Sequence, residues 1–115
     1  MNENGLLGRS GERMAAEYLA TQGLALIDVN WHAGRIGELD LIMQQDDEIV
    51  FVEVKTRRGQ PAAETIDERK LGRLRQLAGT WLAAQSSWFE HRIDMVGVEI
   101  GLTGCQIHWW QGIDR

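Results

Sequence analysis

Charged residues interrupt two otherwise apolar segments that the sequence predicts to pair as a β-hairpin. The segments, residues 36–44 and 48–57, are separated by the turn-forming pair Asp46-Asp47. Side chains alternate along a strand, so in the second segment Phe51, Glu53 and Lys55 share one face. The opposite face carries Val50, Val52 and Val54. Unpaired charges buried in such a strand cost several kcal/mol, so the fold must supply partners for them.

The first segment shows the same conflict between charge and burial. Glu38 and Asp40 share one face, and a tight turn after the segment brings Asp40 and Glu53 to the same end of the predicted sheet. Carboxylates converging beside Lys55 favour a site for a hard cation such as Mg²⁺ or Mn²⁺. The alternative is a Glu53–Lys55 pair on a half-exposed sheet, and spacing alone leaves both interpretations open. The opposite face is expected to carry Leu39, Leu41 and Met43.

The rest of the chain predicts two helices and three more strands. Ser10 is a candidate cap for the first helix, and Gly23 is a candidate stop. With 115 residues, the chain is expected to form a single α/β domain over residues 1–115, with a mixed, twisted sheet of about five strands flanked by the two helices. The expected order is a helix at 10–22, strands at 24–30, 36–44 and 48–57, a helix at 66–84, and strands at 92–100 and 105–111.

Acidic and basic residues are segregated along the sequence. The net charge of −5 argues against a chain that coats nucleic acid by bulk electrostatics. However, residues 1–53 hold ten acidic and three basic residues, whereas residues 55–75 hold seven basic and three acidic ones. This distribution suits a carboxylate site beside a phosphate-binding surface.

Cysteine content and apolar runs indicate the expected compartment. The single cysteine, Cys105, cannot form an internal disulfide. No apolar run approaches the roughly 20 residues that span a bilayer, and the first residues do not have the pattern of a signal peptide. We therefore expect a cytoplasmic protein that does not enter membranes.

Several stretches match a known group of enzymes. Asp40 followed by Glu53-Val54-Lys55 on a hairpin, after an N-terminal helix that carries Glu12, resembles the core of the PD-(D/E)xK nuclease superfamily. Leu39 stands where the name of the motif has proline. Within that superfamily the chain resembles the small YraN-like (UPF0102) family of endonuclease-like bacterial proteins, and its layout is similar to that of archaeal Holliday-junction resolvases. The resemblance covers nearly the whole chain and weakens after about residue 100.

The resemblance implies a restriction-endonuclease-like core and a metal-dependent endonuclease that hydrolyses phosphodiester bonds, in DNA rather than RNA, with Mg²⁺ or Mn²⁺. It implies that Asp40 and Glu53 ligate the metal with the Val54 carbonyl, and that Glu12 completes the site. Lys55 is implied to position the attacking water or to stabilise developing negative charge. Without metal the three carboxylates should repel one another, so at least one should have a raised pKa.

A different class of function stays open. The acidic net charge also suits a nuclease-like nucleic-acid-binding or scaffold module with little or no turnover. The complete set of carboxylates and lysine favours the enzyme, because an inactive site has no physical need to keep like charges together. Metal binding without cleavage of any substrate would favour the module.

Basic and aromatic residues outside the hairpin suggest partners. Arg57 continues the face of Glu53 and Lys55, and Lys70 and Arg73 lie on one side of the second helix, where they can contact phosphates or simply form an exposed basic surface. Asp94 lies in an apolar strand and is expected to be a buried, hydrogen-bonded support. The terminal strand carries Trp109-Trp110, either a homodimer contact or part of the core of its own domain.

Overall fold

The computed structural model describes residues 3–61 and 66–115. Its element order, helix, three strands, helix and two strands, is the predicted one. The elements are α1 (Glu3–Thr21), β1 (Ala25–His32), β2 (Glu38–Gln45), β3 (Glu48–Arg58), α2 (Glu68–Ala83), β4 (Glu90–Ile100) and β5 (Cys105–Trp110).

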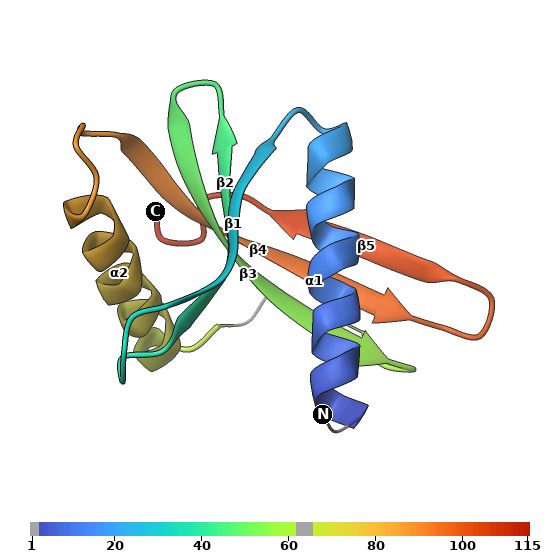
Figure 1. Cartoon of the computed structure of the whole chain (residues 1–115). Coiled ribbons are helices and arrows are strands. Elements are labelled where there is room, and N and C mark those ends of the chain that lie inside the picture. Colours follow the sequence, from blue (N-terminus) through green and yellow to red (C-terminus); the bar gives the residue numbers. More distant parts are fainter. Residues whose placement is uncertain (1–2, 62–65) are drawn as a thin grey trace.

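The strands form one mixed sheet in the order β1-β2-β3-β4-β5 (Figure 1). β3 and β4 pair in parallel across the α2 connection, and the other neighbours pair antiparallel. α1 packs on one face of the sheet and α2 on the other (Figure 1). This confirms the predicted α/β class and the restriction-endonuclease-like core.

The central strand β3 is fixed by burial on both of its faces. Val50 and Val52 pack beneath α1, whereas Phe51 packs beneath α2, with its ring centroid 5.8 Å from that of Trp81. Fully burying a side chain of this size stabilises a fold by roughly 1.5–3 kcal/mol. The predicted alternation of β3 is therefore confirmed, and β3 is a rigid base for the polar residues that follow Val52.

The predicted alternation of β2 is wrong at its start. Leu39 packs in the cluster beneath α2, whereas Leu41 and Met43 pack in the cluster beneath α1. The change of face occurs at Asp40, immediately beyond Leu41 and Val52, where the regular pairing of β2 with β3 ends. Because the strands part at this point, a polar side chain fits between them without disturbing either cluster.

The first helix begins earlier than predicted. α1 starts at Glu3, so Ser10 lies inside the helix and does not cap it. Glycine costs a helix about 1 kcal/mol per residue, and packing of α1 on the sheet outweighs that cost at the glycines before Ser10. The predicted stop is confirmed: the helix ends before Gly23, which has a φ of 97° that favours glycine.

Trp109 belongs to the interior of its own domain. Its ring packs edge-on against Tyr18 of α1, and its Nε1 donates a hydrogen bond to Asp94. Trp110 is half-buried and stacks on His108. Of the two tryptophans predicted to form a homodimer contact, only Trp110 is still a candidate. The homodimer itself stays a prediction.

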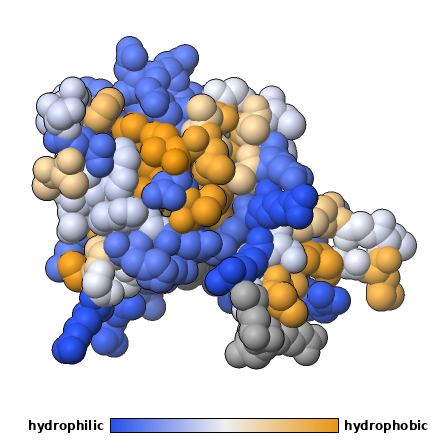
Figure 2. All heavy atoms as spheres, viewed as in Figure 1, coloured by the Kyte–Doolittle hydropathy of each residue, from blue (hydrophilic) through white to orange (hydrophobic). Residues whose placement is uncertain are grey.

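Exposed apolar side chains gather on the opposite edge of the sheet. Leu26, Ile27 and Val29 of β1 are exposed, and Figure 2 shows the apolar surface over this strand beside α1. Neither helix in the described part of the chain is long and apolar enough to cross a bilayer.

Candidate functional site

Three neighbouring strands bring polar residues to one level of the sheet. In the antiparallel register of β1 and β2, Asn30 and Asp40 both fall between the pairs Val29–Leu41 and Trp31–Leu39. In the register of β2 and β3, Asp40 and Glu53 follow directly after the paired residues Leu41 and Val52. Asp40 and Glu53 therefore lie together, as the hairpin register predicted, but at the point where β2 and β3 part and not at an end of the sheet, because β3 continues to Arg58.

Asp40 occupies the gap where β2 and β3 part. Its Oδ2 accepts a hydrogen bond of 2.9 Å from the backbone N–H of Val54. The side chain thus takes the place of a backbone acceptor in the ladder. Burial, and then the nearby negative charge of Glu53, raise the pKa of Asp40 to about 7, although the Val54 hydrogen bond favours the charged form.

Glu12 reaches the same site from α1. Its Oε1 accepts a hydrogen bond of 3.0 Å from the Asn30 side-chain amide. Burial raises the pKa of Glu12, and the charges of Asp40 and Glu38 raise it further, against the opposing effect of the Asn30 hydrogen bond. At least one carboxyl group therefore has a raised pKa, as predicted, although burial and not repulsion among the carboxylates is the largest cause.

Gly11 explains why Glu12 can approach the sheet so closely. A Cβ atom at Gly11 would overlap the Thr56 side chain of β3. Only glycine lets the helix backbone lie this near the strand. Gly11 therefore sets the height of Glu12 above Asp40.

We expect Gly11→Ala to lower the free energy of unfolding by about 2 kcal/mol, because the added methyl group forces α1 away from β3. Gly8→Ala is the matched control in the same helix, since a Cβ there meets nothing within 4 Å. The control should stabilise by about 0.5–1 kcal/mol. Urea denaturation measures both variants, and equal stability of Gly11→Ala and wild type would contradict the close contact.

Glu53 is paired with a residue of α2. The Lys70 Nζ lies 3.2 Å from the Glu53 Oε1. Burial raises the pKa of Glu53, and the positive charge of Lys70 acts in the opposite direction. The predicted phosphate-binding residue Lys70 is therefore engaged by a site carboxylate.

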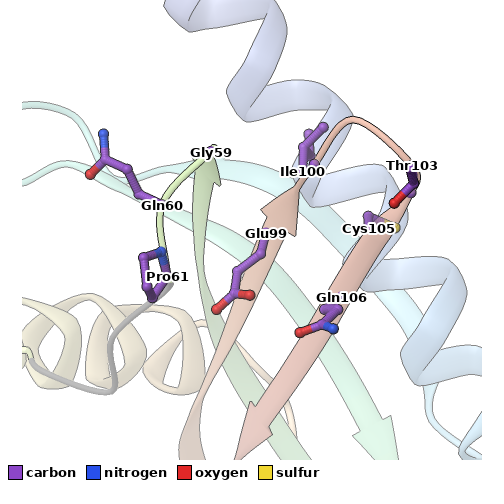
Figure 3. Close-up of a pocket in the computed structure, with 10 residues that line it drawn as sticks. Gly59, Gln60, Pro61, Glu99, Ile100, Thr103, Cys105 and Gln106 are labelled. Carbon is purple, nitrogen blue, oxygen red and sulfur yellow. The ribbon is translucent and has the colours of Figure 1, made fainter.

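A cavity of about 570 Å³ opens beside these carboxylates. Arg57 and Arg58 place positive charge at the rim of this acidic cavity. A neighbouring cavity of about 430 Å³ shares Gln60 and is lined by the paired residues Glu99 of β4 and Gln106 of β5 (Figure 3). The lining of the first cavity comprises Leu7, Gly8, Glu12, Asp40, Glu53, Val54, Thr56, Arg57, Arg58 and Gln60.

The oxygen donors of the site fit a hard divalent cation. Carboxylate oxygens of Glu12, Glu38 and Asp40 lie within 4.8 Å of one another. All-oxygen sites of this kind suit Mg²⁺ or Mn²⁺. The compact group contains Glu38, which was not among the predicted ligands. The predicted ligand Glu53 is outside this group, and Lys70 pairs with one of its oxygens.

The other residues predicted to take part, Lys55, Arg57 and Arg73, lie at different distances from the carboxylates. Lys55 is half-buried and follows Glu53 on the same face of β3, but it does not line the cavity. Arg57 lines the cavity. Arg73 is exposed, and its side chain lies beside Gly37, before β2, so α2 presents Lys70 rather than Arg73 to the carboxylates.

Three residues of the site were not predicted from the sequence: Asn30, Glu38 and Arg58. Asn30 has a φ of 48° within β1, and asparagine is otherwise depleted in strands. Glu38 shares the alternation pattern of Asp40, so its position two residues earlier was the available signal. Arg58 was detectable only as the continuation of a basic run.

The chain is similar to the proteins of one family. The model of "Uncharacterised protein family UPF0102" matches residues 11–98. UPF0102 proteins of Mycobacterium bovis and Mycobacterium tuberculosis are 46% identical over 101 residues, which cover 83% of this chain and 78% of each relative. The solved structure of Pyrococcus furiosus SfsA in complex with Ca²⁺ is similar with a TM-score of 0.38 and 14% identity, over 94% of this chain and 63% of that one. The family match over most of the chain, together with the 46% identity to these relatives, shows that the protein belongs to UPF0102, the nuclease-like YraN family.

Proposed function

We propose that this protein is a metal-dependent endonuclease that hydrolyses phosphodiester bonds in nucleic acid, DNA rather than RNA. One observation carries the proposal: Glu12, Asp40 and Glu53, from three different elements, converge on one cavity whose rim carries Arg57 and Arg58. Burying like charges together is costly in a protein without a cation to share. Membership of a nuclease-like family supports the same chemistry.

Different residues of the chain have different roles in such a reaction. Asp40, with Glu12, Glu38 or Glu53, holds the cation through carboxylate oxygens. A divalent cation held there supplies Lewis acidity and offsets the negative charge of the phosphate. Lys55 stabilises negative charge that develops on the phosphate, and Arg57 and Arg58 position the nucleic-acid backbone.

One observation favours the nuclease-like binding module as a second candidate. Lys70 already neutralises Glu53 at 3.2 Å, so part of the acidic charge is balanced without any cation. A module that binds nucleic acid through Arg57 and Arg58 would keep this arrangement. Such a module would bind DNA without cleaving it.

Cleavage assays separate the two candidates. We expect labelled linear, flapped or four-way DNA to be cut in Mg²⁺ or Mn²⁺ and to stay intact in chelator. Glu53→Gln and Lys55→Met should each lower the single-turnover rate by at least about 100-fold, because they remove a ligand and a charge-stabilising group. Matched RNA substrates test the preference for DNA.

Glu17→Gln is the control for these variants. Glu17 is exposed on α1 and pairs with Arg13, so the substitution makes the same charge change away from the cavity. Its rate should stay within about twofold of wild type. Calorimetric metal binding with no cleavage of any substrate would reject the enzyme in favour of the binding module.

A further inference from the structure

One residue of α2 reaches into the group of carboxylates. Lys70 lies in the first turn of the helix, where its backbone N–H donates a hydrogen bond of 2.7 Å to the capping Asp67 side chain. The cap fixes the start of the helix, and the ammonium extends from there to lie 3.2 Å from Glu53 Oε1. The contact thus joins the helix on one face of the sheet to the middle of β3, where the pairing of β3 with β2 ends.

The two partners of this ion pair differ in their freedom to move. The Glu53 side chain is 15% exposed and is held on a buried strand, whereas the Lys70 side chain is 44% exposed. A lysine ammonium on a flexible, partly hydrated stem can leave its partner and be solvated again at low cost. The carboxylate cannot leave, so any exchange of partners at Glu53 requires Lys70 to move.

We propose that Lys70 is the resident counter-ion of the candidate metal site and competes with a divalent cation for the Glu53 carboxylate. This inference rests on the proposed function, because it requires a cation to bind beside Asp40 and Glu53. Lys70 neutralises Glu53 while no cation is bound, and it must release that carboxylate before both Glu53 oxygens can serve a cation. The released ammonium is then available to a phosphate of the substrate.

The positive charge of Lys70 is expected to weaken the binding of a cation to the site. Burial raises the pKa of both Asp40 and Glu53, and the charge of Lys70 acts to lower each of them, so its field reaches both carboxyl groups. A positive charge that stabilises these carboxylates also repels a second cation placed among them. Removing it should strengthen cation binding by roughly tenfold.

Calorimetric titration with Mn²⁺ alone tests the inference on the full chain. The variants are Lys70→Met and, as a control with the same change of net charge, Arg69→Met at the neighbouring exposed position of the same helix turn. We expect Lys70→Met to lower the Kd for Mn²⁺ by about tenfold, and Arg69→Met to change it by less than about twofold. Circular dichroism before each titration verifies that the variants are folded.

The outcomes distinguish this inference from the proposed function. If wild type binds Mn²⁺ and Lys70→Met binds it equally or more weakly, the counter-ion role is overturned while the metal site stands. If wild type shows no binding but Lys70→Met does, the competition is supported in its strongest form. If neither protein binds Mn²⁺, both the inference and the proposed metal dependence fail.

Discussion

Asp40→Asn is expected to stabilise the protein in chelator and to abolish metal binding. The charged form of Asp40 is disfavoured by burial and by Glu53, which together raise its pKa to about 7. An asparagine carries no charge, yet its side-chain oxygen can still accept the Val54 hydrogen bond. The substitution therefore removes the electrostatic cost and keeps the local structure, as expected where a strained functional site is relieved.

The stabilisation should depend on pH with a defined sign. An unfolded aspartate releases its proton near its ordinary value of 3.8, whereas the folded Asp40 retains it up to about pH 7. The folded state thus binds more protons between these values, so wild-type stability falls as pH rises from about 4 to 7 and then levels. Asp40→Asn lacks this loss, and its advantage should approach about 4 kcal/mol at most above pH 7 and vanish near pH 4.

Thermal melting in chelator across this pH range measures the effect, and Mn²⁺ titration measures the loss of binding. Asp47→Asn is the matched control. Asp47 is exposed in the hairpin turn, so its substitution makes the same charge change away from the cavity. Its melting temperature should follow that of wild type at every pH. A lower melting temperature for Asp40→Asn in chelator would identify Asp40 as a structural acceptor and remove the strongest ligand of the proposed site.

The parts of the fold that sequence predicts well are those governed by local periodicity. In β3 the valines alternate with Phe51 and Glu53, and burial of both faces enforces that alternation. The turn after β2 is equally local: Asp46 has a φ of 53°, and a two-residue hairpin turn requires such a positive angle. The alternation of β3 and the two-residue turn together fix the hairpin register. The sequence therefore predicted that Asp40 and Glu53 lie close together.

The parts that sequence does not predict depend on partners far along the chain. Leu39 changes face because the Asp40 carboxylate bonds to the Val54 N–H and the strands separate there. Alternation cannot indicate that break. Likewise, the sequence alone suggests that Gly11 weakens the helix. The structure shows that a Cβ atom at this position would overlap Thr56 of β3. The Lys70–Glu53 pair joins two elements whose relative placement only the tertiary structure supplies.

Asp94 is a fully buried member of a second charge network, and Asp94→Asn is expected to be severely destabilising. Its two oxygens accept hydrogen bonds from Arg92 Nε at 3.0 Å, from Trp109 Nε1 at 2.9 Å and from the Gly112 N–H at 2.8 Å. An asparagine turns its NH₂ group toward one of these donors in either orientation. Leaving one buried donor unpaired and removing the carboxylate charge beside Arg92 costs about 3–5 kcal/mol. That is a large fraction of the typical stability of a small domain.

The same substitution decides whether Asp94 supports the fold or takes part in the metal chemistry. The Arg92 side chain also pairs with Glu48 at 2.6 Å, at the first residue of β3 and away from Glu53 in the middle of the strand. We therefore expect urea unfolding of Asp94→Asn to show an equal loss in Mn²⁺ and in chelator. Glu48→Gln, which removes a partly exposed partner of the same arginine, should cost only about 1 kcal/mol. If Asp94→Asn instead kept wild-type stability and lost Mn²⁺ binding, Asp94 would be a ligand, and the site would have to extend along β4 beyond the Glu12–Asp40–Glu53 group.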